Sequence, residues 1–100
     1  MNMASEALSD SAITSALEAL DGWERDGDKL VKTFETATYP QGLAFASAAG
    51  MVADGLNHHP DMSIGWKKVT LEFTTHDAGS KITQKDIDTA TAINAIQIRT

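Results

Sequence analysis

Cysteine is absent from the 100 residues of this sequence, which excludes disulfide bonds, a thiolate nucleophile and a cysteine-based zinc site. Basic residues are scarce, because eight Lys and Arg stand against fourteen Asp and Glu for a net charge of −6. That balance argues against nucleic acid or an anionic membrane surface as the main partner. No apolar run approaches the length of a membrane span, and residues 1–10 contain no basic residue of the kind that opens a targeting peptide. We therefore expect a soluble, cytoplasmic protein that is stabilised by packing alone.

The length of the chain limits it to one domain, since a second independent core does not fit into 100 residues. Apolar residues make up 42% and charged residues 22% of the sequence, values that are ordinary for a globular protein and argue against disorder or a coiled coil. We predict a loose N-terminal leader over residues 1–8 and a single domain over residues 9–100.

The N-terminal third of the sequence changes from a helical to a strand pattern. Residues 9–11 offer side-chain oxygens for a helix cap, and apolar residues follow at helical spacing from Ile13 to Leu20. This pattern predicts a first helix that ends at Gly22. Residues 23–35 then form two short runs around an Asp-Gly-Asp turn sequence, which predicts a β-hairpin.

Two capping-box sequences mark the starts of two further helices. Residues 38–41 (Thr-Tyr-Pro-Gln) open the first, and apolar residues at three-four spacing continue it to about Leu56. Residues 83–86 (Thr-Gln-Lys-Asp) open the second, which carries apolar residues at helical spacing. Between these helices, residues 60–64 and 67–75 flank a Gly-Trp turn, and the second run alternates polar and apolar side chains. They predict a second hairpin with one wet face.

The order of the predicted elements is therefore α-ββ-α-ββ-α. Two antiparallel hairpins separated by a helix predict an α+β fold with two layers, in which a four-stranded antiparallel sheet carries its helices on one face. Such a sheet leaves an edge or a face that a second copy of the chain can cover. We expect a homodimer or homotetramer, and the sequence leaves the choice between them open.

The three histidines are the chemistry-bearing residues, and all of them lie between positions 58 and 76. An imidazole has an ordinary pKa of roughly 6.5, so it supplies both an acid and a base near neutral pH. Single histidines also occur often as surface or capping residues, and three imidazoles can bind zinc. We predict no metal site, because the side chains of the adjacent His58 and His59 must diverge and no HExxH motif is present.

The predicted elements place several of these residues near one another. His59 begins the second hairpin and His76 follows its second strand, so both lie at one edge of an antiparallel pair. Asp54, one helical turn before His58, is placed to accept an imidazole N–H. Asp86 has an equally good structural explanation, as the third residue of a helix-capping box.

A longer pattern of spaced residues resembles the signature of the pterin-4a-carbinolamine dehydratases, a family also known as dimerisation cofactors of a homeodomain transcription factor. The likeness extends from about Ile13 to the C-terminus. The residues that carry it are Asp54-x3-His58-His59-Pro60-x5-Trp66-x9-His76-x9-Asp86.

This resemblance implies dehydration of a 4a-hydroxytetrahydropterin to the quinonoid dihydropterin, a step that recycles the pterin cofactor of aromatic amino acid hydroxylases. It implies no cofactor and no metal. By the same resemblance His58 and His59 form the acid–base pair, while His76 holds the substrate and stabilises charge near the 4a-oxygen. The implied substrate cradle comprises Pro60, Thr75, Asp77 and Ala78, and the matching acidic positions are Asp54 and Asp86.

Two other functions remain open at this point. A member of this family can act without chemistry, as a dimerising coactivator that binds a protein partner through its surface. A relative can also have moved to other work, such as assisting the assembly of another enzyme. The intact set of three histidines favours the dehydratase.

Overall fold

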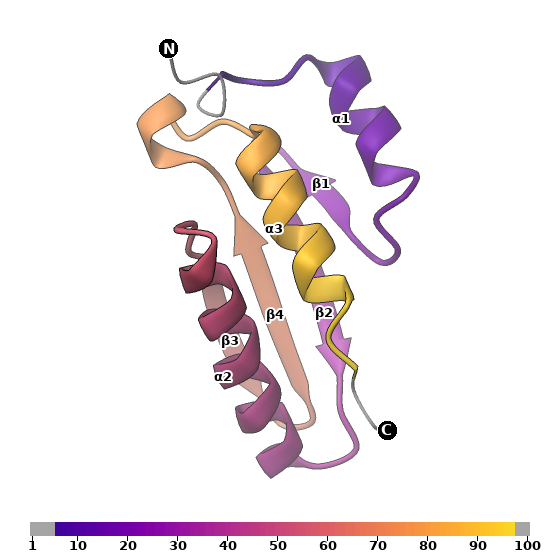
Figure 1. Cartoon of the computed structure of the whole chain (residues 1–100). Coiled ribbons are helices and arrows are strands. Elements are labelled where there is room, and N and C mark those ends of the chain that lie inside the picture. The colour runs from indigo at the N-terminus through magenta and orange to yellow at the C-terminus, as the bar shows by residue number, and fades with distance from the viewer. Residues whose placement is uncertain (1–5, 98–100) are drawn as a thin grey trace.

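A computed structural model describes residues 6–97 of the chain. The predicted order of helices and strands is confirmed, with a short 3-10 turn added before the last helix (Figure 1). The elements are α1 (Asp10–Leu17), β1 (Glu24–Asp26), β2 (Lys29–Glu35), α2 (Tyr39–Gly55), β3 (Asp61–Gly65), β4 (Lys68–Phe73), η2 (His76–Ala78) and α3 (Gln84–Asn94).

The four strands form one antiparallel sheet in the order β1-β2-β4-β3. Each predicted hairpin pairs its own two strands, and β2 joins the hairpins by pairing with β4 from Leu30 opposite Phe73 to Glu35 opposite Lys68. Strand β3 is left at one edge of the sheet. Because β4 ends where β2 begins, the loops after β4 lie beside the turn of the first hairpin.

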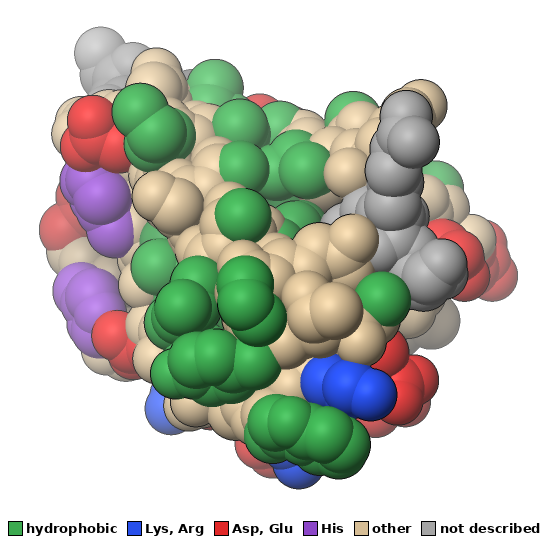
Figure 2. Space-filling view, turned by 90° about the horizontal axis from the view of Figure 1, so that it is seen from below, with side chains coloured by type: hydrophobic (Ala, Val, Ile, Leu, Met, Phe, Trp, Pro, Cys, Tyr) green, Lys and Arg blue, Asp and Glu red, His purple; other side chains and the backbone are tan. Residues whose placement is uncertain are grey.

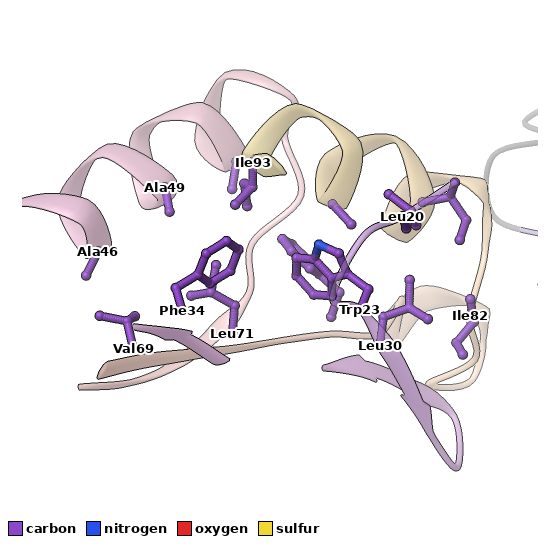
Figure 3. Close-up of a cluster of buried hydrophobic side chains, with 14 of the residues drawn as sticks. Leu20, Trp23, Leu30, Phe34, Ala46, Ala49, Val69, Leu71, Ile82 and Ile93 are labelled. Atoms are coloured by element: carbon purple, nitrogen blue, oxygen red, sulfur yellow. The ribbon is translucent and has the colours of Figure 1, made fainter. Parts of the chain in front are cut away.

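Helices α2 and α3 lie side by side on the same face of the sheet (Figure 1), so the predicted two-layer α+β architecture is confirmed. The alanines at positions 46, 49 and 53 face the sheet and are buried, which lets the backbone of α2 approach it closely. Figure 3 shows the core between the layers, where side chains of the helices meet those of β2 and β4. Its large members are Ile13, Leu20, Trp23, Leu30, Phe34, Phe45, Val69, Leu71, Phe73, Ile82, Ile87 and Ile93.

The first helix is shorter than predicted. It ends at Leu17, and beyond it the amides of residues 18–20 bond the carbonyl three residues earlier rather than four. This tighter winding keeps Leu20 buried although it lies outside the helix. Gly22, the predicted end point, has φ of 82° and turns the chain into the first hairpin.

Lys32 is a charged residue on the core-facing side of β2, between Leu30 and Phe34. Its ammonium donates to the carbonyl of Asp21 at 2.8 Å and to Oδ1 of Asn94 at 2.9 Å, and it lies 4.4 Å from the centre of the Phe34 ring. Burial lowers the pKa of Lys32, and the Asp21 carboxylate opposes that shift. The lysine thus joins β2 to the end of α3 while its polar head stays hydrogen-bonded.

The start of the described chain lies against the rest of the molecule. Ala7 forms an isolated β-bridge with Thr83, the amide of Leu8 donates to the carbonyl of Ile82, and the Leu8 side chain packs against the core. Residues 1–5 of the predicted leader lie outside the described residues. Within residues 6–97 no helix is both long and apolar enough to cross a membrane.

Candidate active site

A pocket of about 300 Å³ lies at the end of the sheet where β4 ends, within the size range of small-molecule sites. Its walls come from the turn after α2, the segment after β4, η2 and the first turn of α3. All three histidines line it. His59 and His76, which we expected at the same edge of the sheet, therefore share one pocket. The full lining is Asn57, His58, His59, Thr74, Thr75, His76, Asp77 and Lys85.

The turn that ends α2 brings the histidine pair to this pocket. Asn57 has φ of 54°, the left-handed conformation that asparagine tolerates better than most residues. The amide of Asn57 donates to the carbonyl of Asp54, and the amide of His58 donates to that of Ala53, which is the bonding pattern of a Schellman motif. The chain therefore reverses at Asn57, and His58 and His59 leave it in different directions.

His58 points inward and is held by a buried carboxylate. Its Nε2 lies 2.5 Å from Oδ1 of Asp86, and its ring stacks on Phe73 with centroids 5.6 Å apart. Asp86 is fully buried, and its Oδ2 accepts from the amide of Thr83 at 2.8 Å and from Oγ1 of Thr75 at 2.9 Å. An ionised carboxylate only accepts hydrogen bonds, so the proton between Asp86 Oδ1 and His58 Nε2 lies on the imidazole. The other ring nitrogen of His58, Nδ1, is then the acceptor.

Asp86 combines the predicted capping role with a contact to His58 that was not predicted. The capping box at Thr83 forms as predicted, and the same carboxylate also binds the imidazole of His58. A hydroxyl chain extends the network, because Oγ1 of Thr75 lies 2.7 Å from Oγ1 of Thr83. Every buried polar side-chain atom of the described residues has a hydrogen-bond partner, so His58 is fixed in place before any ligand binds.

His59 and Asp54 form a second, exposed pair. Nε2 of His59 lies 2.9 Å from Oδ1 of Asp54, and their side chains are 60% and 77% exposed. Asp54 therefore bonds the imidazole of His59. His58, which follows Asp54 by one helical turn in the sequence, bonds Asp86 instead. The reason is the Schellman turn, which the spacing of residues alone does not reveal.

His76 enters the pocket from the first position of η2. Its side chain is exposed, and Nδ1 lies 3.4 Å from Oγ of Ser80. Gly79, with φ of 77°, closes this short turn, and Thr75 pairs with Lys81 across it. The histidine is therefore carried on a tight turn, whose two ends are tied together by backbone hydrogen bonds.

The predicted substrate-binding residues divide into two groups. Thr75 and Asp77 line the pocket, whereas Pro60 and Ala78 are half-buried beside it and do not line it. Trp66, another residue of the signature, is 73% exposed in the turn between β3 and β4. Trp23, Phe45 and Phe73 are buried in the core, and the ring of Phe73 also stacks on that of His58.

Three lining residues were not predicted as site residues: Asn57, Thr74 and Lys85. Lys85, in the first turn of α3, adds a cation to the pocket and lies 3.8 Å from Asp77. A signal existed for Asn57, since asparagine is common just after a helix end. No sequence signal existed for Lys85, because only the packing of α3 beside the turn after α2 brings it to the histidines. Within residues 6–97, no three histidine and acidic side chains are grouped so as to hold a metal ion.

Comparison with known proteins identifies the family of this chain. The family model of pterin 4 alpha carbinolamine dehydratase matches residues 6–96. The chain belongs to this family. One curated relative, from Natronomonas pharaonis, is provisionally named as a pterin-4-alpha-carbinolamine dehydratase and is 54% identical over 86 residues, which cover 86% of this chain and 90% of the relative. Another, from Roseiflexus sp. strain RS-1, is 47% identical over 89 residues, with 89% and 95% covered.

Solved structures show the same dehydratase fold. A crystal structure from Brucella melitensis, described as a transcriptional coactivator/pterin dehydratase, has a TM-score of 0.83 and 28% identity, covering 90% of this chain and 97% of that one. A pterin dehydratase-like protein described as a RuBisCO assembly factor of the alpha-carboxysome has a TM-score of 0.57 and 20% identity, covering 73% of this chain and 83% of that one. The second likeness concerns the fold alone.

Proposed function

We propose that this protein dehydrates a 4a-hydroxytetrahydropterin to the quinonoid dihydropterin, the step that recycles a pterin cofactor. The single observation that carries the proposal is the pocket in which His58, fixed on buried Asp86, meets His59 and His76. Membership of the dehydratase family supports the same reaction.

The reaction needs one base and one acid. The 4a-hydroxyl leaves as water after it receives a proton, and the proton on N5 is removed, so the C4a–O bond is replaced by a C4a–N5 double bond. We assign the base to His58, because Asp86 stabilises the imidazolium that forms when Nδ1 takes the proton. We assign the acid that protonates the departing hydroxyl to one of the exposed imidazoles, His59 or His76. No redox step or Lewis acid enters this balance.

The proposal is tested by adding purified protein to freshly generated 4a-hydroxytetrahydropterin and following its loss by ultraviolet absorbance. We expect acceleration over the spontaneous reaction, and we expect that acceleration to persist in a metal chelator because the chemistry uses only imidazoles. A folded protein that leaves the spontaneous rate unchanged would show that this assignment is wrong.

We also propose that the chain forms a homo-oligomer through an apolar patch beside the open edge of the sheet. Large hydrophobic side chains are exposed on α2, on the edge strand β3 and on the turn after it. Figure 2 shows hydrophobic side chains grouped on the face seen from below, with histidines at its border. The members of this edge patch are Leu43, Met51, Leu56, Met62, Ile64 and Trp66. An unpaired edge strand next to exposed apolar side chains is suited to pairing with a second copy.

Charges placed in the edge patch test this assembly. We expect the double variant Met51→Glu, Ile64→Lys to run as a monomer in size-exclusion chromatography with light scattering, at a concentration where the wild-type chain is a dimer or tetramer. Thr14→Glu, on the exposed side of α1, is the control and keeps the wild-type mass. A wild-type chain that stays monomeric at its highest soluble concentration rules the proposal out.

The edge patch also favours one second candidate function, the binding of a protein partner without chemistry. The similar protein from Brucella melitensis is described as a transcriptional coactivator as well as a pterin dehydratase. The two functions are separated by a double variant, His58→Gln with His59→Gln, which keeps the patch. If the wild-type chain captures a protein partner but shows no turnover, and the double variant still captures that partner, the binding role is favoured.

A further inference from the structure

A second hollow, of about 490 Å³, adjoins the histidine pocket. The two share Thr74 and His76 as lining residues, so they lie on either side of these side chains. The walls of the second hollow come from the turn of the first hairpin, the start of β3 and the loop after η2. Its lining is Asp26, Asp28, Lys29, Asp61, Thr74, His76 and Ser80. We call it the acidic hollow.

The charge of the acidic hollow is negative after its ion pairs are counted. Asp28 lies 3.1 Å from Lys81, and Lys29 lies 3.2 Å from Glu72, so these two charges are balanced by residues outside the hollow. Asp26 and Asp61 are exposed, and neither forms an ion pair within residues 6–97. Two uncompensated carboxylates therefore face any group that enters from the histidine side.

The geometry of a pterin relates the two hollows to each other. The reacting carbon C4a is bonded to N5, and N5 is bonded to C6, which carries the variable substituent of natural pterins. With C4a at the imidazoles, that substituent leaves the ring from the reacting edge, where His76 separates the two hollows. We propose that the acidic hollow binds the C6 substituent and selects neutral polyhydroxyl chains over anionic ones. This inference rests on the proposed function, because it places the pterin ring in the histidine pocket.

The chemistry of the lining favours hydroxyl groups. Carboxylates accept hydrogen bonds from the hydroxyls of a polyol, and the Ser80 hydroxyl can both donate and accept. A phosphate or carboxylate at the same place meets the negative charges of Asp26 and Asp61 at short range, with no uncompensated cation among the lining residues. Repulsion of this kind is reduced by salt in an exposed hollow.

The test is a binding titration with three stable, oxidised pterins, followed by their intrinsic fluorescence. The probes are 6-methylpterin, whose substituent is too short to cross His76, neopterin, whose trihydroxypropyl chain is neutral, and neopterin 3′-phosphate, which differs by the anion alone. We expect neopterin to bind at least as tightly as 6-methylpterin. We expect the phosphate to bind about tenfold more weakly than neopterin at low salt, which corresponds to about 1.4 kcal/mol.

Variants identify the residues responsible. Asp26→Asn with Asp61→Asn should bring the affinity for the phosphate to within about threefold of that for neopterin, while binding of 6-methylpterin stays at the wild-type level. The control is Glu18→Gln with Asp88→Asn, which removes the same charge from exposed residues that line neither hollow. This control tests whether net charge alone explains the effect. We expect it to keep the full difference in affinity between neopterin and its phosphate.

The outcomes separate this inference from the proposed function. The acidic hollow is overturned as a selective site if all three probes bind equally, or if the control variant gains as much affinity for the phosphate as the Asp26/Asp61 variant does. Either result leaves the dehydratase proposal standing. Failure of all three probes to bind overturns the proposed function together with this inference. Discrimination that disappears only in the Asp26/Asp61 variant supports both.

Discussion

His58→Gln should lower kcat for pterin dehydration by about 10²–10⁴-fold, the range for loss of a positioned acid or base. Glutamine is chosen because its amide can still donate to Asp86 as Nε2 of the imidazole does, but it takes up no proton at neutral pH. We therefore expect the free energy of unfolding to change little while turnover is lost. His58→Ala should lose turnover too, with a stability penalty, because it leaves a buried carboxylate without one of its donors.

The matched variant is His59→Gln, which changes the exposed partner of Asp54. If His59 is the acid, this variant should lower kcat by a factor in the same range as His58→Gln. Its free energy of unfolding should stay at the wild-type level, because the His59–Asp54 pair is exposed. Absorbance kinetics and urea denaturation, measured on the same preparations, separate the two effects. Wild-type turnover in both glutamine variants would refute histidine acid–base catalysis in this pocket.

Asp86→Ala should be the most destabilising single substitution in the site, by about 3–5 kcal/mol, because each buried donor left without an acceptor costs about 1–3 kcal/mol. The loss leaves the Thr83 amide, the Thr75 hydroxyl and the His58 ring without their shared acceptor. For a chain of this size each kcal/mol lowers Tm by about 4–8 °C. Thermal unfolding followed by circular dichroism measures the shift.

Asp86→Asn separates positioning from stability. The amide keeps the size of the carboxylate, but its nitrogen donates where an oxygen accepted, so one contact of the network becomes donor against donor. We expect a smaller stability loss than for alanine, together with a fall in kcat, because His58 is no longer held with its proton on Nε2. Asp54→Asn, at the exposed pair, is the control for a comparable change without burial. Unchanged kcat in Asp86→Asn, in a folded protein, would show that Asp86 acts only as a cap.

The secondary structure followed from local signals that physical chemistry makes strong. The capping residues Thr38 and Thr83 accept from the amides of Gln41 and Lys85, and the turn sequence at residues 26–28 forms the first hairpin. The end of α1 was predicted too far along the chain, because Leu20 kept the helical spacing of apolar residues. Its burial is achieved instead by a tighter turn before Gly22.

The candidate site was predictable in composition and only partly in arrangement. The three histidines share a pocket, and the antiparallel register of the second hairpin implied this proximity for His59 and His76. Lys85 joins them only because α3 packs beside the turn after α2 and the segment after β4. A spacing argument works along one element, whereas these contacts join elements that are distant in the sequence.

The sequence by itself determined the elements, their order, the two-layer fold and the set of imidazoles, since caps, turns and periodicity act between near neighbours. Tertiary structure decided the strand order, in which β2 pairs with β4. It also decided that His58 bonds Asp86, 28 residues away, while Asp54 bonds His59. The physical reason is that a buried carboxylate must find its hydrogen-bond donors wherever the packed chain supplies them. Local patterns do not encode which distant donors those are.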